Sequence, residues 1–321
     1  MSQGQFISFC TADALTRAAE QLMAGVLVAF PTETVYGLGA DATNGEAVAR
    51  IYQVKGRPAD HPLIVHLADM QDIADWAEEI PDYAIDLARS FWPGPMTLIL
   101  QRSELAKDFI TGGQETVGLR VPDHTLALAF LNAFKKIGGK GVAAPSANRF
   151  GHLSPTTSEA VREELGEFLN ESDIVLNGGP SSIGVESTII DCTGAAPRIL
   201  RPGAITTEMV EAVTGVKVEN REDVIRVSGS LEHHYAPAAQ VVLDGHPRPG
   251  DGLIALNTYS TPEGAIRLAS PINNDDFARQ LYTALREADA QGIDQVIVIQ
   301  PEGADIAIAI RDRLGRAASG R

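Results

Sequence analysis

Cysteine is scarce in this sequence: Cys10 and Cys192 are the two in 321 residues, and neither lies in a motif. This implies no disulfide framework, so we expect two ordinary buried thiols in a cytoplasmic protein. No apolar run approaches the length needed to cross a bilayer, so we expect no membrane association. The N-terminus also lacks the basic start and apolar stretch of a secretory signal.

Basic side chains are also few, because 26 Lys and Arg stand against 42 Asp and Glu, a formal net charge of −16. A surface this acidic repels phosphate backbones, so we expect no tight non-specific nucleic-acid binding. Several cations nevertheless lie in glycine- and proline-rich turns, apart from the acidic helices: Lys55, Arg57, Arg120, Arg198 and Arg201. A local basic cavity in an acidic protein favours a small anionic ligand, since guanidinium groups match the paired oxygens of carboxylates and phosphates.

Three common catalytic or binding motifs are missing. There is no Walker-type Gly-x-x-x-x-Gly-Lys-Ser/Thr loop, so a nucleotide would be held differently. There is no Gly-x-Ser-x-Gly elbow, so Ser146 in Pro-Ser-Ala-Asn is better interpreted as a ligand contact than as a nucleophile. His233 and His234 have no Cys, Asp or Glu partners at metal-binding spacing, so we expect no metal ligands from the protein.

The most informative stretch covers residues 25–67. Its two apolar runs, 25–30 and 63–67, predict buried strands, and the helix between them is predicted to end at Gly56. Hydroxyls and a carboxylate at 32–34, the cations beside Gly56, and His66 at the second strand's end would then meet in one region. Such a set suits a small polar anion. Taken singly, however, Lys-x-Arg is more typical of a solvated helix end, and a strand-end His of a core position.

Other features of the first two hundred residues are less specific. The periodicity predicts helices over 11–24 and, broken at Pro81, over 69–92. Gly37 and Gly39 are expected to let the backbone approach another group closely. Frequent short strands without regular alternation favour a mixed α/β sheet over a doubly wound one.

The chain divides into three parts: a first domain over 1–211, a linker over 212–238 where the periodicity fades, and a second domain over 239–321. The second domain has a βαβα pattern, which predicts a small parallel, Rossmann-like α/β unit. Its predicted strands are 241–243, 253–256 and 295–299, and its predicted helices lie near 276–290 and 305–318. It carries no Gly-x-Gly-x-x-Gly motif and no catalytic cluster.

The pair Lys55-Gly-Arg57, followed downstream by Ser146-Ala-Asn148, is the signature of a known family. With it, the sequence closely resembles the YrdC-type threonylcarbamoyl-AMP synthases in their longer, two-domain form. The resemblance is strong up to the end of the linker and rests more on length and pattern beyond it. It implies a mixed, twisted, YrdC-like sheet with a cationic cavity, and a linker that acts as a lid.

The resemblance also implies residue roles. Lys55 and Arg57 would be catalytic. L-threonine would be bound by Thr34, His66, Arg120, Ala144 and Ser187, with Arg120 binding its carboxylate. ATP would be bound by Arg57, His61, Thr116, Ser146, Asn148, Ser154, Arg201 and Tyr235, with Tyr235 closing over the nucleotide from the linker. Mg²⁺ would enter with ATP.

By resemblance, the reaction joins L-threonine, bicarbonate or CO2, and ATP to give threonylcarbamoyl-adenylate and pyrophosphate. Other proteins of the tRNA-modification machinery would then transfer the threonylcarbamoyl group to tRNA. Two alternatives stay open: an RNA-binding module that uses the basic cavity, and a carbamoyltransferase acting on carbamoyl phosphate. The chain departs from the family at His61, where Asn is usual, and at Ser228, where Pro is usual. We expect a pH-sensitive phosphate contact and a looser hinge.

Overall fold

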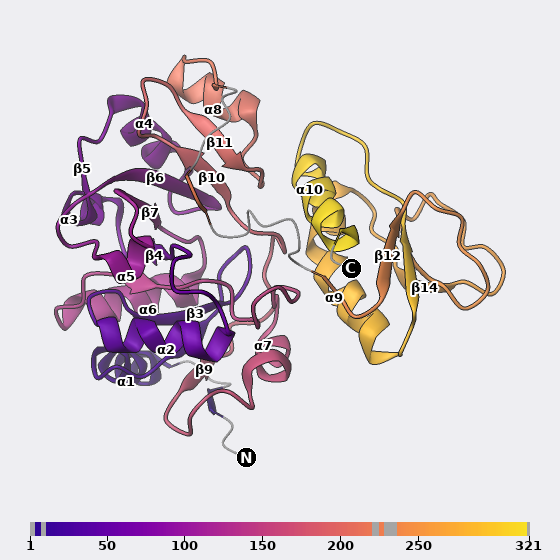
Figure 1. The fold of residues 1–321 in the computed structure, drawn as a ribbon, viewed down its shortest axis with the longest axis horizontal. Coiled ribbons are helices and arrows are strands. Elements are labelled where there is room, and N and C mark those ends of the chain that lie inside the picture. Colours follow the sequence, from indigo (N-terminus) through magenta and orange to yellow (C-terminus); the bar gives the residue numbers. More distant parts are fainter. Residues whose placement is uncertain (1–3, 8–10, 220–224, 228–235, 320–321) are drawn as a thin grey trace.

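The computed structural model describes residues 4–7, 11–219, 225–227 and 236–319, and these form two α/β units (Figure 1). The larger unit has a mixed sheet and the smaller one an all-parallel sheet, which confirms the predicted fold class. Helix α8 (Thr207–Thr214) crosses the first predicted domain boundary, and the bounds at 211 and 238 stay predictions. No helix among the described residues is long and apolar enough to cross a bilayer.

The large sheet has the strand order β1-β9-β2-β3-β8-β4-β7-β6-β10-β11, and β5 pairs with β6. Parallel pairs such as β4–β7 and β6–β10 alternate with antiparallel ones such as β6–β7 and β4–β8. The strands are β1 (Gln5–Ile7), β2 (Val28–Phe30), β3 (Gly37–Asp41), β4 (Ile64–His66), β5 (Ala77–Glu78), β6 (Met96–Arg102), β7 (Thr116–Arg120), β8 (Val142–Ala143), β9 (Ile174–Leu176), β10 (Thr188–Asp191) and β11 (Arg198–Arg201).

Helices of this unit begin and end where side-chain chemistry predicts. The Thr11 hydroxyl accepts a hydrogen bond from the Ala14 N–H and caps α1, whose apolar face packs on α6. Gly56 ends α2 in the left-handed conformation. The helices are α1 (Ala12–Met23), α2 (Gly45–Lys55), the 3₁₀ turn η1 (Met70–Asp72), α3 (Ile73–Trp76), α4 (Asp82–Phe91), α5 (Asp108–Thr111), α6 (Thr125–Lys136), α7 (Ser158–Leu165) and α8.

One expectation for this unit needs correction, and another gains a specific cause. The segment 69–92 is not helical throughout, because Ala77 and Glu78 form β5 against β6, a long-range pairing that local periodicity does not register. Gly37 and Gly39, which are expected to let the backbone approach another group closely, lie in strand β3. A Cβ on Gly39 would lie 2.8 Å from Val142 Cγ1 and 2.9 Å from the Val28 carbonyl oxygen. The expected close approach is therefore found at Gly39, where the neighbouring strands are the groups approached.

The smaller sheet has the order β12-β15-β13-β14 with every pair parallel, as predicted. The sequence prediction missed β14, a partly exposed edge strand that has a weak apolar pattern. On α9, the apolar side chains of Phe277, Leu281, Leu285 and Ala288 recur at helical spacing and are fully buried. Elements of this unit are β12 (Gln240–Leu243), β13 (Gly252–Ile254), β14 (Ile266–Ala269), α9 (Asn274–Ala290), β15 (Gln295–Val298) and α10 (Ala307–Ala318).

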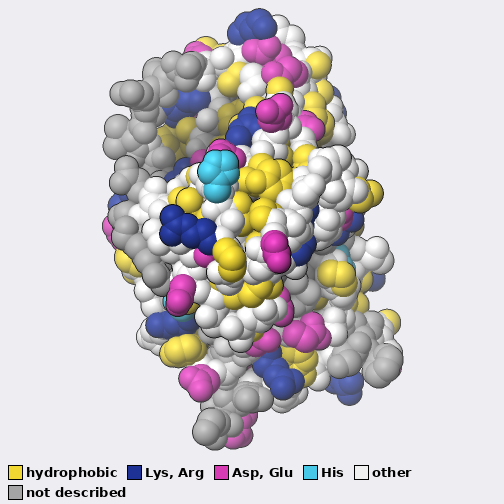
Figure 2. All heavy atoms as spheres, turned by 90° about the vertical axis from the view of Figure 1, so that its right-hand side faces the viewer, with side chains coloured by type: hydrophobic (Ala, Val, Ile, Leu, Met, Phe, Trp, Pro, Cys, Tyr) yellow, Lys and Arg dark blue, Asp and Glu magenta, His cyan; other side chains and the backbone are white. Residues whose placement is uncertain are grey.

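Two further features of the surface and core bear on function. Figure 2 views the molecule from the side of the smaller unit, where hydrophobic side chains gather near the centre and charges of both signs lie around them. That face therefore carries no uniform basic stripe over its described residues. Cys192 is a buried free thiol, as expected, while Cys10 lies outside the described residues.

Candidate active site

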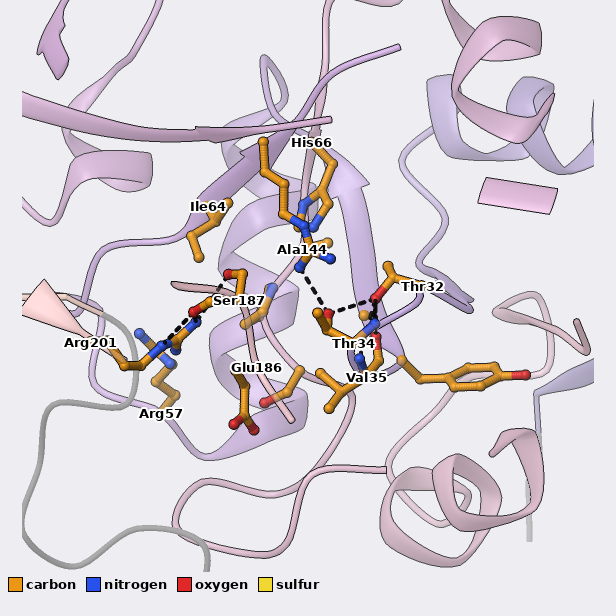
Figure 3. Close-up of a pocket in the computed structure, with 15 residues that line it drawn as sticks. Thr32, Thr34, Val35, Arg57, Ile64, His66, Ala144, Glu186, Ser187 and Arg201 are labelled. Atoms are coloured by element: carbon orange, nitrogen blue, oxygen red, sulfur yellow. Dashed lines mark hydrogen bonds between the residues drawn. The ribbon is translucent and has the colours of Figure 1, made fainter. Parts of the chain in front are cut away.

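A cavity of about 530 Å³, its open mouth included, lies where several strands of the large sheet end (Figure 3). Segments far apart in the chain contribute to its wall, because β4 and β7 are parallel neighbours and present their carboxyl ends together. The lining residues are Thr32, Thr34, Val35, Tyr36, Gly37, Arg57, Ile64, His66, Arg120, Ala144, Pro145, Ser146, Glu186, Ser187 and Arg201.

Eight residues singled out from the sequence line this one cavity: Thr34, Arg57, His66, Arg120, Ala144, Ser146, Ser187 and Arg201. Three of them are guanidinium groups, from the end of α2, the end of β7 and the end of β11. Their shared wall, within a chain of net charge −16, makes the cavity a local site for anions.

The remaining predicted residues lie elsewhere. Thr116 lines a neighbouring, mainly apolar hollow with Ile64 and Val227. His61 packs edge-on against the Phe150 ring, 5.4 Å between centroids, while Tyr235 and Ser228 lie outside the described residues. Ser154, Lys55 and Asn148 do not line the cavity: Ser154 donates to Glu186 and Lys55 to the Ser146 carbonyl, both of the wall, and Lys55 also donates to the Asn148 carbonyl.

Arg198 is a correction to the predicted basic cluster. Its Nη2 lies 2.7 Å from Asp191 Oδ2 in a buried ion pair, and Arg198 does not line the cavity. Arg198 and Arg201 are three positions apart on β11, and side chains at odd spacing on a strand point to opposite faces. The two arginines therefore have different surroundings.

Arg120 is held by the loop that follows β2. Its Nη1 donates to Thr34 Oγ1 at 2.9 Å, and its Nη2 lies 2.6 Å from Glu33 Oε1. The Thr32 and Thr34 hydroxyls are also hydrogen-bonded to each other, at 2.9 Å. The hydroxyl–carboxylate–hydroxyl run that stood out in the sequence thus orients this guanidinium at the cavity wall.

His66 occupies the last position of β4, where it is buried and packs edge-on against Phe30. Burial, with the neighbouring charge of Arg120, lowers the pKa of His66 from 6.5 to about 3. The imidazole is therefore neutral at physiological pH. A neutral ring can donate one hydrogen bond and accept another without adding charge to the cavity.

The end of α2 separates the two cations of the signature. Gly56 adopts a φ of 62°, which ends the helix between Lys55 and Arg57. Lys55 Nζ donates to the main-chain carbonyls of Ser146 and Asn148, whereas Arg57 lines the cavity and donates to the Pro62 carbonyl at 2.9 Å. Burial, and then the charge of Arg57, lowers the pKa of Lys55 well below its usual 10.5. Through its two hydrogen bonds, Lys55 holds the loop of Ser146 and Asn148 in place from behind the wall.

His61, the residue that departs from the family pattern, also lies near Arg57. Partial burial, followed by the charge of Arg57, lowers the pKa of His61 below 6.5. The neutral form is therefore favoured at neutral pH, and a proton would be gained only under acid conditions.

Ser187 and Arg201 form one corner of the cavity. Arg201 donates through Nε and Nη2 to the Ser187 carbonyl, at 3.1 and 2.9 Å, and through Nη2 to the Ser187 hydroxyl at 3.2 Å (Figure 3). The same hydroxyl is 2.8 Å from Thr97 Oγ1. This network holds the Arg201 guanidinium against the strand ends.

Glu186 is the charged lining residue that sequence reasoning missed. Its carboxylate accepts hydrogen bonds from the hydroxyls of Ser154, at 2.6 Å, and Tyr282, at 3.0 Å, and from Arg313 Nε at 2.7 Å. Tyr282 and Arg313 belong to the smaller unit, so no local pattern in the sequence indicates this cluster. Among the described residues, no group of three or more His, Cys, Asp or Glu is arranged to hold a metal ion.

Two family models match this chain, one for each of its two parts. A family model described as "Telomere recombination" matches residues 20–203, and one described as "Threonylcarbamoyl-AMP synthase, C-terminal domain" matches residues 205–319. Together they cover both units and define a two-domain protein. The chain belongs to the threonylcarbamoyl-AMP synthase family.

Individual relatives agree over the full length. The threonylcarbamoyl-AMP synthase of Pyrococcus abyssi is 38% identical over 95% of this chain and 94% of its own. That of Bacillus subtilis is 38% identical over 96% and 93%. The solved structure of P. abyssi Sua5 complexed with L-threonine has a TM-score of 0.86 and 35% identity, covering 100% of this chain and 98% of that one.

Proposed function

We propose that this protein is a threonylcarbamoyl-AMP synthase that joins L-threonine, bicarbonate or CO2, and ATP into threonylcarbamoyl-AMP and pyrophosphate. The supporting observation is the shared cavity of Arg57, Arg120 and Arg201 with a neutral His66 and the hydroxyl side chains of Thr32, Thr34, Ser146 and Ser187. This combination offers cations to a carboxylate and to phosphates, and uncharged polar groups to an amino acid.

The chemistry asks for positioning more than for a protein nucleophile. The neutral amine of threonine attacks CO2, forms a C–N bond and loses a proton, giving a carbamate. A carbamate oxygen then attacks the α-phosphorus, and the bond to pyrophosphate breaks. Aligning these reactants and offsetting charge on the phosphates supplies the acceleration.

We assign the residues of the cavity to two binding sites, one for L-threonine and one for ATP. Arg120, oriented by Thr34 and Glu33, would bind the threonine carboxylate, with His66, Ser187 and the backbone at Ala144 around it. Arg57 and Arg201 would bind the phosphates beside Ser146, with Asn148, Ser154 and Lys55 supporting them. Thr116, His61 and Tyr235 would complete the ATP site, and Tyr235 would close over it and exclude water from the carbamate.

Mg²⁺ would enter bound to ATP and neutralise charge on its phosphates. The described residues offer no group of three acidic or His ligands, and Glu186 is already bound by Arg313, Tyr282 and Ser154. Triphosphate oxygens and water therefore fit as the ligands of the ion.

We further propose that the product passes to tRNA-modifying proteins in the cytoplasm. Purified protein with MgATP, L-threonine and bicarbonate should release pyrophosphate only when all three are present. Turnover that needs carbamoyl phosphate instead of threonine would support a carbamoyltransferase. Absence of turnover, with RNA retained at physiological salt, would support an RNA-binding module.

A further inference from the structure

Two side chains of the smaller domain, Arg313 and Tyr282, contact Glu186 in the wall of the cavity, and Arg313 also contacts the segment that carries Arg201. Arg313 lies on α10 and is fully buried, with 0% of its side chain exposed. Its Nε lies 2.7 Å from Glu186 Oε2, and its Nη2 donates to the Pro202 carbonyl at 3.0 Å. Glu186 directly precedes Ser187, and Pro202 directly follows Arg201. One guanidinium from the second domain therefore bridges the two segments that carry Ser187 and Arg201.

These two segments are also packed tightly against each other. A Cβ on Gly203 would lie 2.3 Å from the Thr188 backbone nitrogen, so the two chains are in contact immediately beyond the bridge. The Thr188 hydroxyl donates to the Ile205 carbonyl at 2.9 Å. With so little free space, displacing either segment would move the other. The position of the Ser187–Arg201 corner therefore depends on both segments and on Arg313, which contacts each of them.

The charges at this point make the bridge important for Arg201. Burial by itself would raise the pKa of Glu186, but the charges of Arg313 and then Arg201, with hydrogen bonds from Arg313 and Ser154, lower it to about 2. Glu186 is therefore an ionised, buried carboxylate. Arg313 and Arg201 are the two cations whose charges lower this pKa, so without Arg313 the carboxylate would attract Arg201 alone and draw it from the position in which it contacts Ser187.

We propose that Arg313 is a positioning residue for the synthase reaction, through which the second domain holds Ser187 and Arg201 in binding geometry. Tyr282 on α9 assists by donating to the same carboxylate. The inference rests on the proposed function, since Ser187 is assigned there to L-threonine and Arg201 to ATP. It gives the second domain a role inside the cavity without adding a catalytic group.

The same interface offers a matched control. Arg286 on α9 makes a second ion pair between the domains, with Nη1 2.6 Å from Glu164 Oε1, and also donates to the Leu153 carbonyl. Its side chain is largely buried, at 17% exposed. Glu164 does not line the cavity. Arg286→Met therefore removes an interdomain cation while leaving Ser187 and Arg201 in place.

The test compares pyrophosphate release by full-length wild type, Arg313→Met and Arg286→Met, with KM measured separately for L-threonine and for ATP. We expect Arg313→Met to raise both KM values, and to lower kcat/KM on the order of tenfold or more, as residues that support a binding group do. Arg286→Met should keep both KM values. A purely structural role would lower the active fraction of Arg313→Met, and so kcat, at unchanged KM.

Further variants keep the test decisive if Arg313→Met does not fold. Tyr282→Phe removes one hydroxyl at constant shape and should raise both KM values less strongly. Arg313→Lys keeps the charge and should recover part of the loss. Equal KM values in wild type, Tyr282→Phe and whichever Arg313 variants fold would overturn the inference. An inactive wild type would instead reject the proposed function itself.

Discussion

The Lys55 ammonium is hydrogen-bonded to the main-chain carbonyl of Ser146, and also to that of Asn148. The two halves of the family signature are thus bound to each other. Lys55 does not line the cavity, whereas Ser146 does. The hydrogen bonds of Lys55 therefore hold the loop that forms the wall, and Arg57 is the signature cation that lines the cavity.

Lys55→Met should lower both stability and activity. The substitution leaves two buried carbonyls without their donor, which we expect to cost about 2–5 kcal/mol of unfolding free energy. Chemical denaturation measures the first effect, and pyrophosphate release at a temperature where the variant stays folded measures the second. Arg89→Met, at an exposed ion pair on α4, is the control and should change neither. Unchanged stability would contradict the anchoring role.

Arg57→Ala should separate activity from stability. Loss of a cation aimed at the phosphates should reduce kcat by roughly 100-fold or more. The unfolding free energy should fall by about 1–2 kcal/mol, less than for Lys55→Met, since Arg57 faces the cavity. Near-normal turnover would count against both its role and the proposed reaction.

His66 should make stability depend on pH in acid. Its pKa is about 3 in the folded protein and near 6.5 in the unfolded chain, so the unfolded chain binds the proton more tightly. Its contribution is fully present above pH 6.5 and is lost as the pH falls toward 3, at roughly 1.4 kcal/mol per pH unit. Unfolding free energies of wild type and His66→Gln, measured from pH 7 to 4, should converge as the pH falls. Parallel curves would show that His66 is not buried neutral.

Thr34→Val should change the KM for L-threonine and leave the KM for ATP unchanged. The substitution keeps the shape but removes the hydroxyl that accepts from Arg120, so this guanidinium loses a partner that orients it. We expect the KM for L-threonine to rise roughly tenfold, with the KM for ATP unchanged. Thr16→Val, on the exposed face of α1, serves as control. An equal rise in the KM for ATP would contradict the assignment of Thr34 to the L-threonine site.

Local patterns were sufficient where a residue's role depends on its own element. His66, Arg120 and Arg201 each end a short strand, and each is singled out from the sequence by that position. They converge because β4, β7 and β11 run in the same direction in the mixed sheet. The same reasoning failed for Arg198, because its partner Asp191 comes from the neighbouring strand, directly opposite in the register. The position of a cation near a turn does not show which carboxylate pairs with it across the sheet.

By itself, the sequence determined the chemistry that is available: scarce cysteine, an acidic surface, a few cations at element ends, and a signature that joins Lys55 and Arg57 to Ser146 and Asn148. Tertiary structure alone decided which charges face the cavity. Lys55 donates hydrogen bonds to main-chain carbonyls behind the wall. Glu186 is paired with Arg313, which lies 127 residues further along the chain. The physical reason is that a buried charge must be paired with its neighbours in space, and such neighbours need not be close in sequence.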